Sequence, residues 1–126
     1  MTNKSDEKTK IITAFRKYTR LGLASEMLSP FLAHRRIRGI SRSLDEAYDL
    51  LAVYDTVRIL KLLKRNEELD TVKAVYFSDR NILQRKNIIT MRVIRHAYET
   101  NCDERTVYRQ LQFARRLYSS IRKSYQ

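Results

Sequence analysis

The chain has 126 residues, 43% of them apolar, which is enough to bury a core and excludes a disordered basic tail. Its 26 Lys and Arg against 14 Asp and Glu give a net charge of +12, which favours a polyanionic partner such as DNA, RNA or an anionic membrane surface. Two Gly and one Pro cannot supply the many turns of an all-β fold, so the composition predicts an all-α protein.

The residues that usually carry chemistry are few and scattered. Cys102 has no partner for a disulfide, and His34 and His96 lie too far apart to predict a metal site, so no metal or cofactor is expected. Neither His has a nucleophile or carboxylate placed beside it, and we expect no enzymatic activity. The polar start and the absence of a long apolar run predict a protein of the cytoplasm without a membrane segment.

The excess positive charge is concentrated near the C-terminal end. Residues 1–30 carry a net charge of +3, residues 31–79 a net charge of +1, and residues 80–126 a net charge of +8. A charge that served only solubility would be spread evenly along the chain. The asymmetry therefore favours a nucleic-acid-binding surface in the last third.

The first helix is predicted to begin at about Thr9, after frayed residues 1–8. Apolar residues recur there at three- and four-residue steps, and Gly22 weakens the helix without having to end it. Pro30 marks a boundary, because the residue before a proline is pushed out of the helical region. The short segment 31–42 follows, with a break expected at Gly39; its basic run at 34–38 could contact phosphate or could be a solvated connector.

A capping box, Ser43 with Glu46, predicts the start of a long helix that ends near Arg65. Its apolar stripe is unusually wide and must be covered on more than one side. The helix is therefore either the central core helix or partly a dimer interface along 44–63. The stripe consists of Leu44, Tyr48, Leu50, Leu51, Val53, Tyr54, Val57, Ile59, Leu60 and Leu62.

The remaining elements are predicted from periodicity and turn residues. They are a helix at 67–78, a turn at 79–81, a helix at 83–99, a turn at 100–102 and a last helix at 103–123. We divide the chain into an N-terminal helical scaffold or oligomerisation region, 1–66, and a helix-turn-helix DNA-binding region, 67–126.

The segment 93–111 has the features of a helix-turn-helix. Ala97 is small enough for two helices to cross, and Asn101 tolerates a left-handed turn conformation. Cys102 can fill the turn, and Asp103 is the predicted N-cap of the second helix. The alternative reading of the same pattern is an ordinary helical hairpin with a charged face.

The last helix has one apolar stripe, and its first turns are expected to enter a major groove. Arg can pair with guanine edges and Gln with adenine, whereas further basic residues meet phosphates. The predicted base-reading residues are Arg105, Thr106, Tyr108, Arg109 and Gln112. The predicted phosphate contacts are Arg92, Arg95, Arg115, Arg116, Arg122 and Lys123.

The run CDERTVYRQLQFARRLY at 102–118 resembles the recognition helix of sigma-factor region 4, and DTVKAVYF at 70–77 is similar to the helix that precedes it. The family resembled is that of phage late-gene transcription regulators of the ArpU and RinA kind. The resemblance covers about 67–121, and the chain departs from the family pattern in the insert 81–92 and in Asp103, where Ser is commoner. It implies a transcriptional activator that binds double-stranded DNA together with host RNA polymerase, with Arg105, Thr106, Tyr108, Arg109 and Gln112 facing the DNA.

Two other functions fit the same features. A phage small terminase subunit also joins a helix-turn-helix to an oligomerising helical part, and would form a ring of subunits. A non-enzymatic adaptor would instead use the basic face to bind a host protein. For a transcription regulator we expect a homodimer, because two short recognition helices read a paired site better than one.

Overall fold

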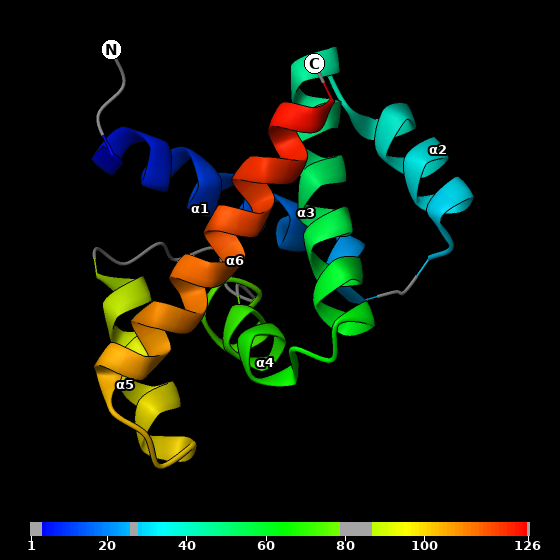
Figure 1. Cartoon of the computed structure of the whole chain (residues 1–126). Helices are drawn as coiled ribbons and strands as arrows, with labels where there is room; N and C mark the ends of the chain where they lie inside the picture. The colour runs from blue at the N-terminus through cyan, green and yellow to red at the C-terminus, as the bar shows by residue number, and fades with distance from the viewer. Residues whose placement is uncertain (1–3, 26–27, 79–86, 126) are drawn as a thin grey trace.

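The computed structural model describes residues 4–25, 28–78 and 87–125 (Figure 1). These residues form six α-helices and a short 3-10 helix, and no strand is found among them, so the predicted all-α class is confirmed. No helix in the described ranges is long and apolar enough to cross a membrane. The elements are α1 (Lys4–Arg20), η1 (Leu23–Ser25), α2 (Pro30–Ile40), α3 (Leu44–Leu62), α4 (Asn66–Val75), α5 (Ile88–Glu99) and α6 (Glu104–Ser124).

The central helix is α3, which contacts α1, α2, α4 and α6. Side chains pointing in every direction around its middle are buried, which explains the wide apolar stripe in the sequence. Leu44 and Leu62, at its two ends, are 60% and 68% exposed. Of the two readings of this stripe, the core helix is right, and the predicted dimer interface along 44–63 is largely occupied by the chain's own helices.

Glycine behaves differently at its two positions. We predicted that Gly22 need not end the first helix, but α1 stops at Arg20 and Gly22 adopts a φ of +76°. Glycine accepts this left-handed conformation without the steric cost that a Cβ would add. Gly39, predicted to break the second helix, lies inside α2, which continues to Ile40. The start of α2 at Pro30 agrees with the predicted boundary.

Half of the predicted capping box at the start of α3 is present. The Ser43 hydroxyl accepts a hydrogen bond from the Glu46 amide at 3.1 Å. The Glu46 carboxylate, however, pairs with Lys17 on α1, with Nζ and Oε2 3.1 Å apart. Glu46 therefore joins α1 to α3. At the other end, Lys64 has a φ of 57°, and the Arg65 amide donates to the Leu60 carbonyl, which closes the helix without a glycine.

The longest helix, α6, crosses the molecule and joins its two ends (Figure 1). It contacts α4 and α5 at one end, and α3 and α1 at the other. Phe15 of α1 contacts Tyr76, Phe77 and Tyr118, with ring centroids between 5.3 and 5.9 Å apart. The buried side chains of both predicted regions form one continuous cluster. The predicted boundary at 66 coincides with the junction between α3 and α4.

The helices on either side of the insert are shorter than predicted. The helix predicted at 67–78 is α4, which ends at Val75, and that predicted at 83–99 is α5, which begins at Ile88. The predicted turn at 79–81 lies outside the described residues. Asn87, with a φ of 73°, precedes α5.

Candidate nucleic-acid interface

The hairpin formed by α5 and α6 has the turn that the sequence predicted. Asn101 takes a φ of 55°, and the Cys102 amide donates to the Ala97 carbonyl at 3.0 Å. Ala97 is buried where the helices meet, and the half-buried Cys102 packs against the core. The Asp103 carboxylate accepts from the Thr106 amide at 2.8 Å, which makes Asp103 the N-cap of α6.

The Asp103 carboxylate is stabilised in its charged form. Hydrogen bonds from the amide and then the hydroxyl of Thr106 lower the pKa of Asp103, and Arg105 and Arg109 contribute a smaller effect in the same direction. The cap is therefore ionised at neutral pH. Its negative charge also suits the positive end of the α6 dipole.

A polar group buried between α4, α5 and α6 was not predicted. The Thr71 hydroxyl donates to Gln110 Oε1 at 2.5 Å, and Thr71 Oγ1 lies 3.1 Å from His96 Nε2. Because the single hydroxyl proton is directed to Gln110, Nε2 of His96 must be the donor in the second bond. This bond gives the buried His96 ring a polar partner. In the sequence, the only sign that His96 is buried is its place on the inner face of a helix.

The two faces of α6 differ sharply. Val107, Leu111, Ala114 and Tyr118 are buried on the inner face, while Leu117 and Ile121 are half-buried. Directly opposite, at steps of three, four and finally seven residues, lies an exposed outer row that we call the α6 row. It consists of Arg105, Arg109, Gln112, Arg116 and Lys123.

The α6 row is long and carries one sign of charge. Its 18 residue steps correspond to about 27 Å along the helix axis. No Asp or Glu occurs in 105–126, so no acidic side chain of this segment neutralises the row. Such a row favours a positive potential along the outer side of α6, the helix that crosses the front of the molecule in Figure 1.

The predicted base-reading residues do not all point outward. Arg105, Arg109 and Gln112 are exposed members of the α6 row, and Tyr108 lies beside it with 37% exposure. Thr106 is half-buried, and its hydroxyl donates to the Asp103 carboxylate at 2.9 Å. In this structure Thr106 supports the cap, and its hydroxyl proton is already used.

The predicted phosphate contacts fall into two groups. Arg95, Arg116 and Lys123 are exposed. Arg92 instead donates from Nη1 to the Val75 carbonyl at 3.0 Å, at the end of α4, and Arg115 donates to the Tyr76 hydroxyl at 2.9 Å. These two bonds link α5 and α6 to the end of α4. Sequence alone could not separate the two groups, because the carbonyl and hydroxyl acceptors of Arg92 and Arg115 come from a segment distant in the sequence.

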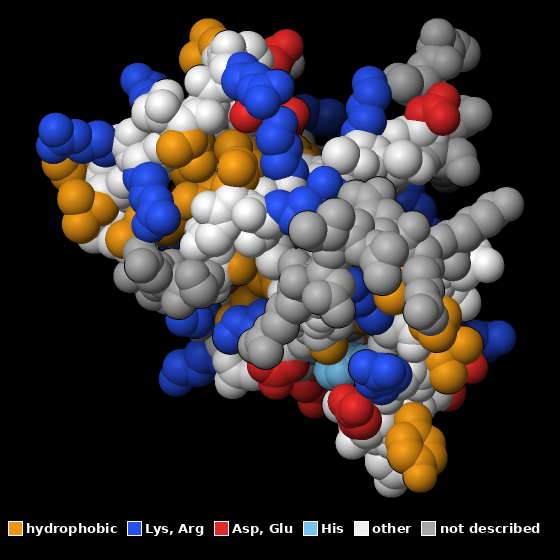
Figure 2. All heavy atoms as spheres, turned by 180° about the vertical axis from the view of Figure 1, so that it is seen from behind, with side chains coloured by type: hydrophobic (Ala, Val, Ile, Leu, Met, Phe, Trp, Pro, Cys, Tyr) orange, Lys and Arg blue, Asp and Glu red, His pale blue; other side chains and the backbone are white. Residues whose placement is uncertain are grey.

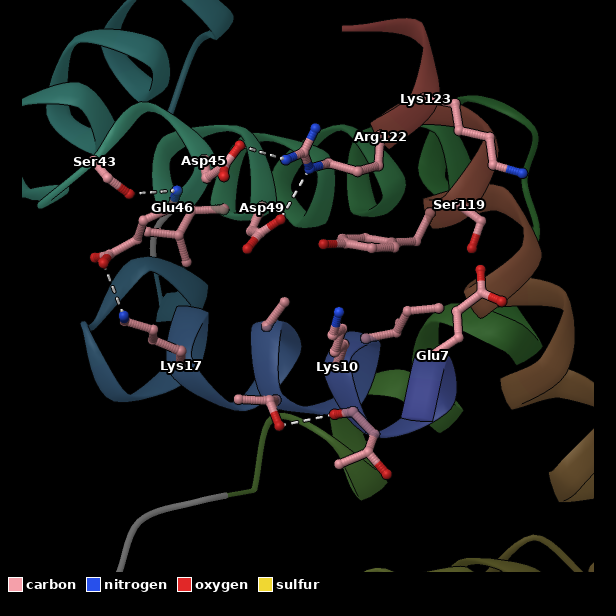
Figure 3. Close-up of a pocket in the computed structure, with 16 residues that line it drawn as sticks. Glu7, Lys10, Lys17, Ser43, Asp45, Glu46, Asp49, Ser119, Arg122 and Lys123 are labelled. Atoms are coloured by element: carbon pink, nitrogen blue, oxygen red, sulfur yellow. Dashed lines mark hydrogen bonds and ion pairs between the residues drawn. The ribbon is translucent and has the colours of Figure 1, made fainter. Parts of the chain in front are cut away.

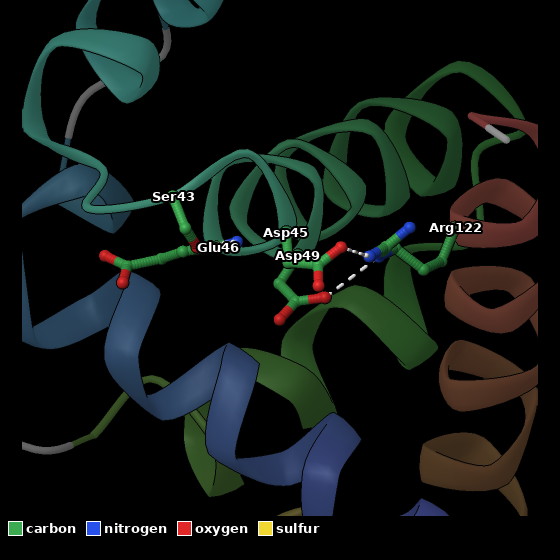
Figure 4. A network of polar contacts seen from close by, with 5 residues as sticks. All are labelled: Ser43, Asp45, Glu46, Asp49 and Arg122. Carbon is green, nitrogen blue, oxygen red and sulfur yellow. Dashed lines mark hydrogen bonds and ion pairs between the residues drawn. The ribbon is translucent and has the colours of Figure 1, made fainter.

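Arg122 belongs to the second group. Its Nε donates to Asp49 at 2.9 Å, and its Nη2 lies 3.4 Å from Asp45 (Figure 4). Its guanidinium also lies 5.3 Å from the centre of the Tyr48 ring. Partial burial opposes the charge of Arg122, but the hydrogen bond and the charge of Asp49 raise its pKa.

Two tyrosines complete this attachment of α6 to α3. Tyr125 donates a hydrogen bond to Asp55. Burial raises the pKa of Tyr118, and the nearby Asp49 raises it further. Burial raises the pKa of Tyr125 as well, and its bond to Asp55 adds to the effect. We call Arg122, Tyr125 and their partners Asp45, Asp49 and Asp55 the C-terminal clamp.

A pocket of about 700 Å³ lies beside this clamp, between α1, α3 and α6 (Figure 3). Four cationic and four acidic side chains line it, and Lys17 and Arg122 already pair with its carboxylates. The mixed charge favours neither an anionic nor a cationic ligand. Its charged residues are Glu7, Lys10, Lys17, Asp45, Glu46, Asp49, Arg122 and Lys123.

The α6 row, the hairpin turn and the buried Thr71–His96–Gln110 group therefore form the candidate interface. It is an exposed, positively charged surface rather than a pocket, which suits a polyanion better than a small molecule. Comparison of the chain with protein-family models, curated proteins and solved structures gave no match.

Proposed function

We propose that the protein is a sequence-specific, double-stranded-DNA-binding transcription regulator that reads DNA with the first turns of α6. The observation that carries the proposal is the α6 row, in which Arg105, Arg109 and Gln112 are exposed together ahead of Arg116 and Lys123. Arg and Gln have the donor patterns that recognise guanine and adenine edges in a major groove. The capped hairpin acts as a helix-turn-helix in this proposal.

We propose a smaller contact set than the sequence alone suggested. Arg105, Arg109 and Gln112 are the proposed base readers, with Tyr108 beside them. Arg95, Arg116 and Lys123 are the proposed phosphate contacts, since all three are exposed. Arg92, Arg115, Arg122 and Thr106 are left out of the contact set, because their polar groups are already bonded within the chain.

The resemblance of 102–118 to sigma-factor region 4 supports the biological context. We propose a phage or prophage late-gene activator that works in the bacterial cytoplasm with host RNA polymerase. A homodimer remains part of the proposal, but its interface must lie outside the buried middle of α3.

The proposal is tested by selecting bound duplexes from a random pool and then footprinting the enriched sequence. We expect enrichment of one short motif and protection of a defined site. The double variant Arg105→Glu/Arg109→Glu should abolish that protection. Lys61→Glu/Lys64→Glu makes the same charge change at the exposed end of α3 and should retain it. A pool that enriches no motif, or equal loss in both variants, would show that α6 does not read sequence.

A further inference from the structure

A second basic surface lies on α2, apart from α6. Ala33 and Ile37 are buried against α3, which is the one helix that α2 contacts among the described elements. The opposite side of α2 carries Phe31, Arg35 and Arg38 at four- and three-residue steps, and all three are exposed. We call these residues, together with the exposed Arg42 just beyond the helix, the α2 face.

The α2 face carries an excess of positive charge along the sequence. No Asp or Glu occurs in 27–44, and the first acidic residue after this segment is Asp45, three positions beyond Arg42. Seen from behind, Lys and Arg side chains alternate with exposed hydrophobic ones on the side of the molecule where α2 lies (Figure 2). A surface of this kind attracts a polyanion.

Phe31 narrows the choice of polyanion. Its side chain is 73% exposed, although an aromatic ring of this size is normally buried. A phenylalanine among arginines offers a base a stacking surface while the arginines hold the adjoining phosphates. Bases inside a duplex are already stacked and cannot reach such a ring, whereas unpaired bases can.

We propose that the α2 face binds single-stranded nucleic acid, with one base stacked on Phe31 and phosphates held by Arg35, Arg38 and Arg42. From Phe31 to Ile40 the backbone of α2 covers about 14 Å at the helical rise, and Arg42 follows just beyond, so the site takes a few nucleotides. It is separate from the duplex site on α6, and it does not depend on the proposed function being correct.

The test measures fluorescence anisotropy of a labelled 15-nucleotide poly-dT and, in parallel, of a labelled duplex, both with the full chain over a series of salt concentrations centred on about 150 mM. Phe31→Ala should weaken poly-dT binding about tenfold. Arg35→Glu/Arg38→Glu should weaken it more and should reduce the dependence of log K on log salt by about 1.4, the contribution of two phosphates on a single strand. All the altered side chains are exposed, and circular dichroism verifies that each variant is folded.

Two control variants and a comparison with vesicles separate the α2 face from the other basic surfaces. Lys61→Glu/Lys64→Glu removes the same charge elsewhere and should leave poly-dT binding close to that of the wild type. Arg105→Glu/Arg109→Glu should reduce duplex binding much more than poly-dT binding, and the α2 variants should do the reverse. Equal poly-dT affinity for wild type and Phe31→Ala would overturn the proposal. So would α2 variants that lose binding only to vesicles containing phosphatidylserine, which would assign the face to a membrane surface.

Discussion

The two halves of α6 carry the same kind of charge and use it differently. In the first half, Arg105 and Arg109 extend from the protein surface. In the second half, Arg122 is held by Asp49 and Asp45 of α3, across 73 and 77 positions in the sequence. The comparison teaches that arginines of one helix can be exposed to solvent near one end and bonded to the chain's own core near the other.

The largest effect is expected from Leu111→Ala, which tests whether the two halves share one core. Leu111 is 1% exposed, between the two ends of α6, and its truncation should lower the free energy of unfolding by about 2–5 kcal/mol. Chemical denaturation followed by circular dichroism and tyrosine fluorescence should give one coincident transition.

The matched control for Leu111→Ala is Leu62→Ala, at a side chain that is 68% exposed. It should change the free energy of unfolding by no more than about 0.5 kcal/mol. Two separate unfolding transitions in either variant would mean that the ends of α6 belong to independent cores.

A smaller effect, on binding, is expected from Arg109→Ala at the exposed half. If Arg109 reads a base, the variant should lose about 1–3 kcal/mol of affinity for the selected duplex and relax specificity at one position. Lys123→Ala should instead weaken all duplexes alike and reduce the salt dependence of log K by about 0.9, the contribution of one phosphate. Titrations of selected and scrambled duplexes would distinguish the two patterns, and identical behaviour would remove Arg109 from the base-reading set.

Arg122→Ala should lower stability rather than duplex affinity, the opposite of what is expected for Arg109→Ala. Loss of a partly exposed ion pair and of the contact with Tyr48 should lower the free energy of unfolding by about 1 kcal/mol. Duplex affinity should hardly change, although sequence alone predicted Arg122 as a phosphate contact.

A double-mutant cycle of Arg122→Ala with Asp49→Asn isolates the energy of this pair from the other contacts of each residue. A large, uniform loss of duplex binding in the Arg122 variant, with unchanged stability, would show that the clamp opens to bind DNA.

The smallest expected effect is the contribution of the Asp103 cap to the pH dependence of stability. The pKa of Asp103 is lowered in the folded protein from its ordinary value of 3.8, so the cap stabilises the fold above that pH. This contribution is lost as the pH falls through the lower, folded-state pKa. Asp103→Ser keeps a capping oxygen that does not titrate, so its stability should fall less steeply than that of the wild type below about pH 4. If the free energy of unfolding falls equally steeply with pH in the wild type and in Asp103→Ser, the cap is not the source of the pH dependence.

Much of the local structure near the site could be predicted from neighbouring residues. The positive φ of Asn101, the cap at Asp103 and the inner stripe of α6 all follow from side chains within a few positions of one another. Glycine was harder to interpret. Gly22 follows the end of a helix, whereas Gly39 lies inside one. The presence of a glycine does not by itself indicate which backbone conformation the surrounding structure requires.

The amino-acid sequence by itself determined the helical class, the turn before α6 and the one-sided charge of its last segment, because periodicity, capping and composition act over a few residues. Only the tertiary structure decided that α3 is the core helix and that His96 is held by Thr71. It also decided which arginines extend into solvent and which bond to the chain itself. An arginine's role depends on whether a carboxylate or carbonyl from a distant segment is packed beside it, and that is known only once the helices are assembled.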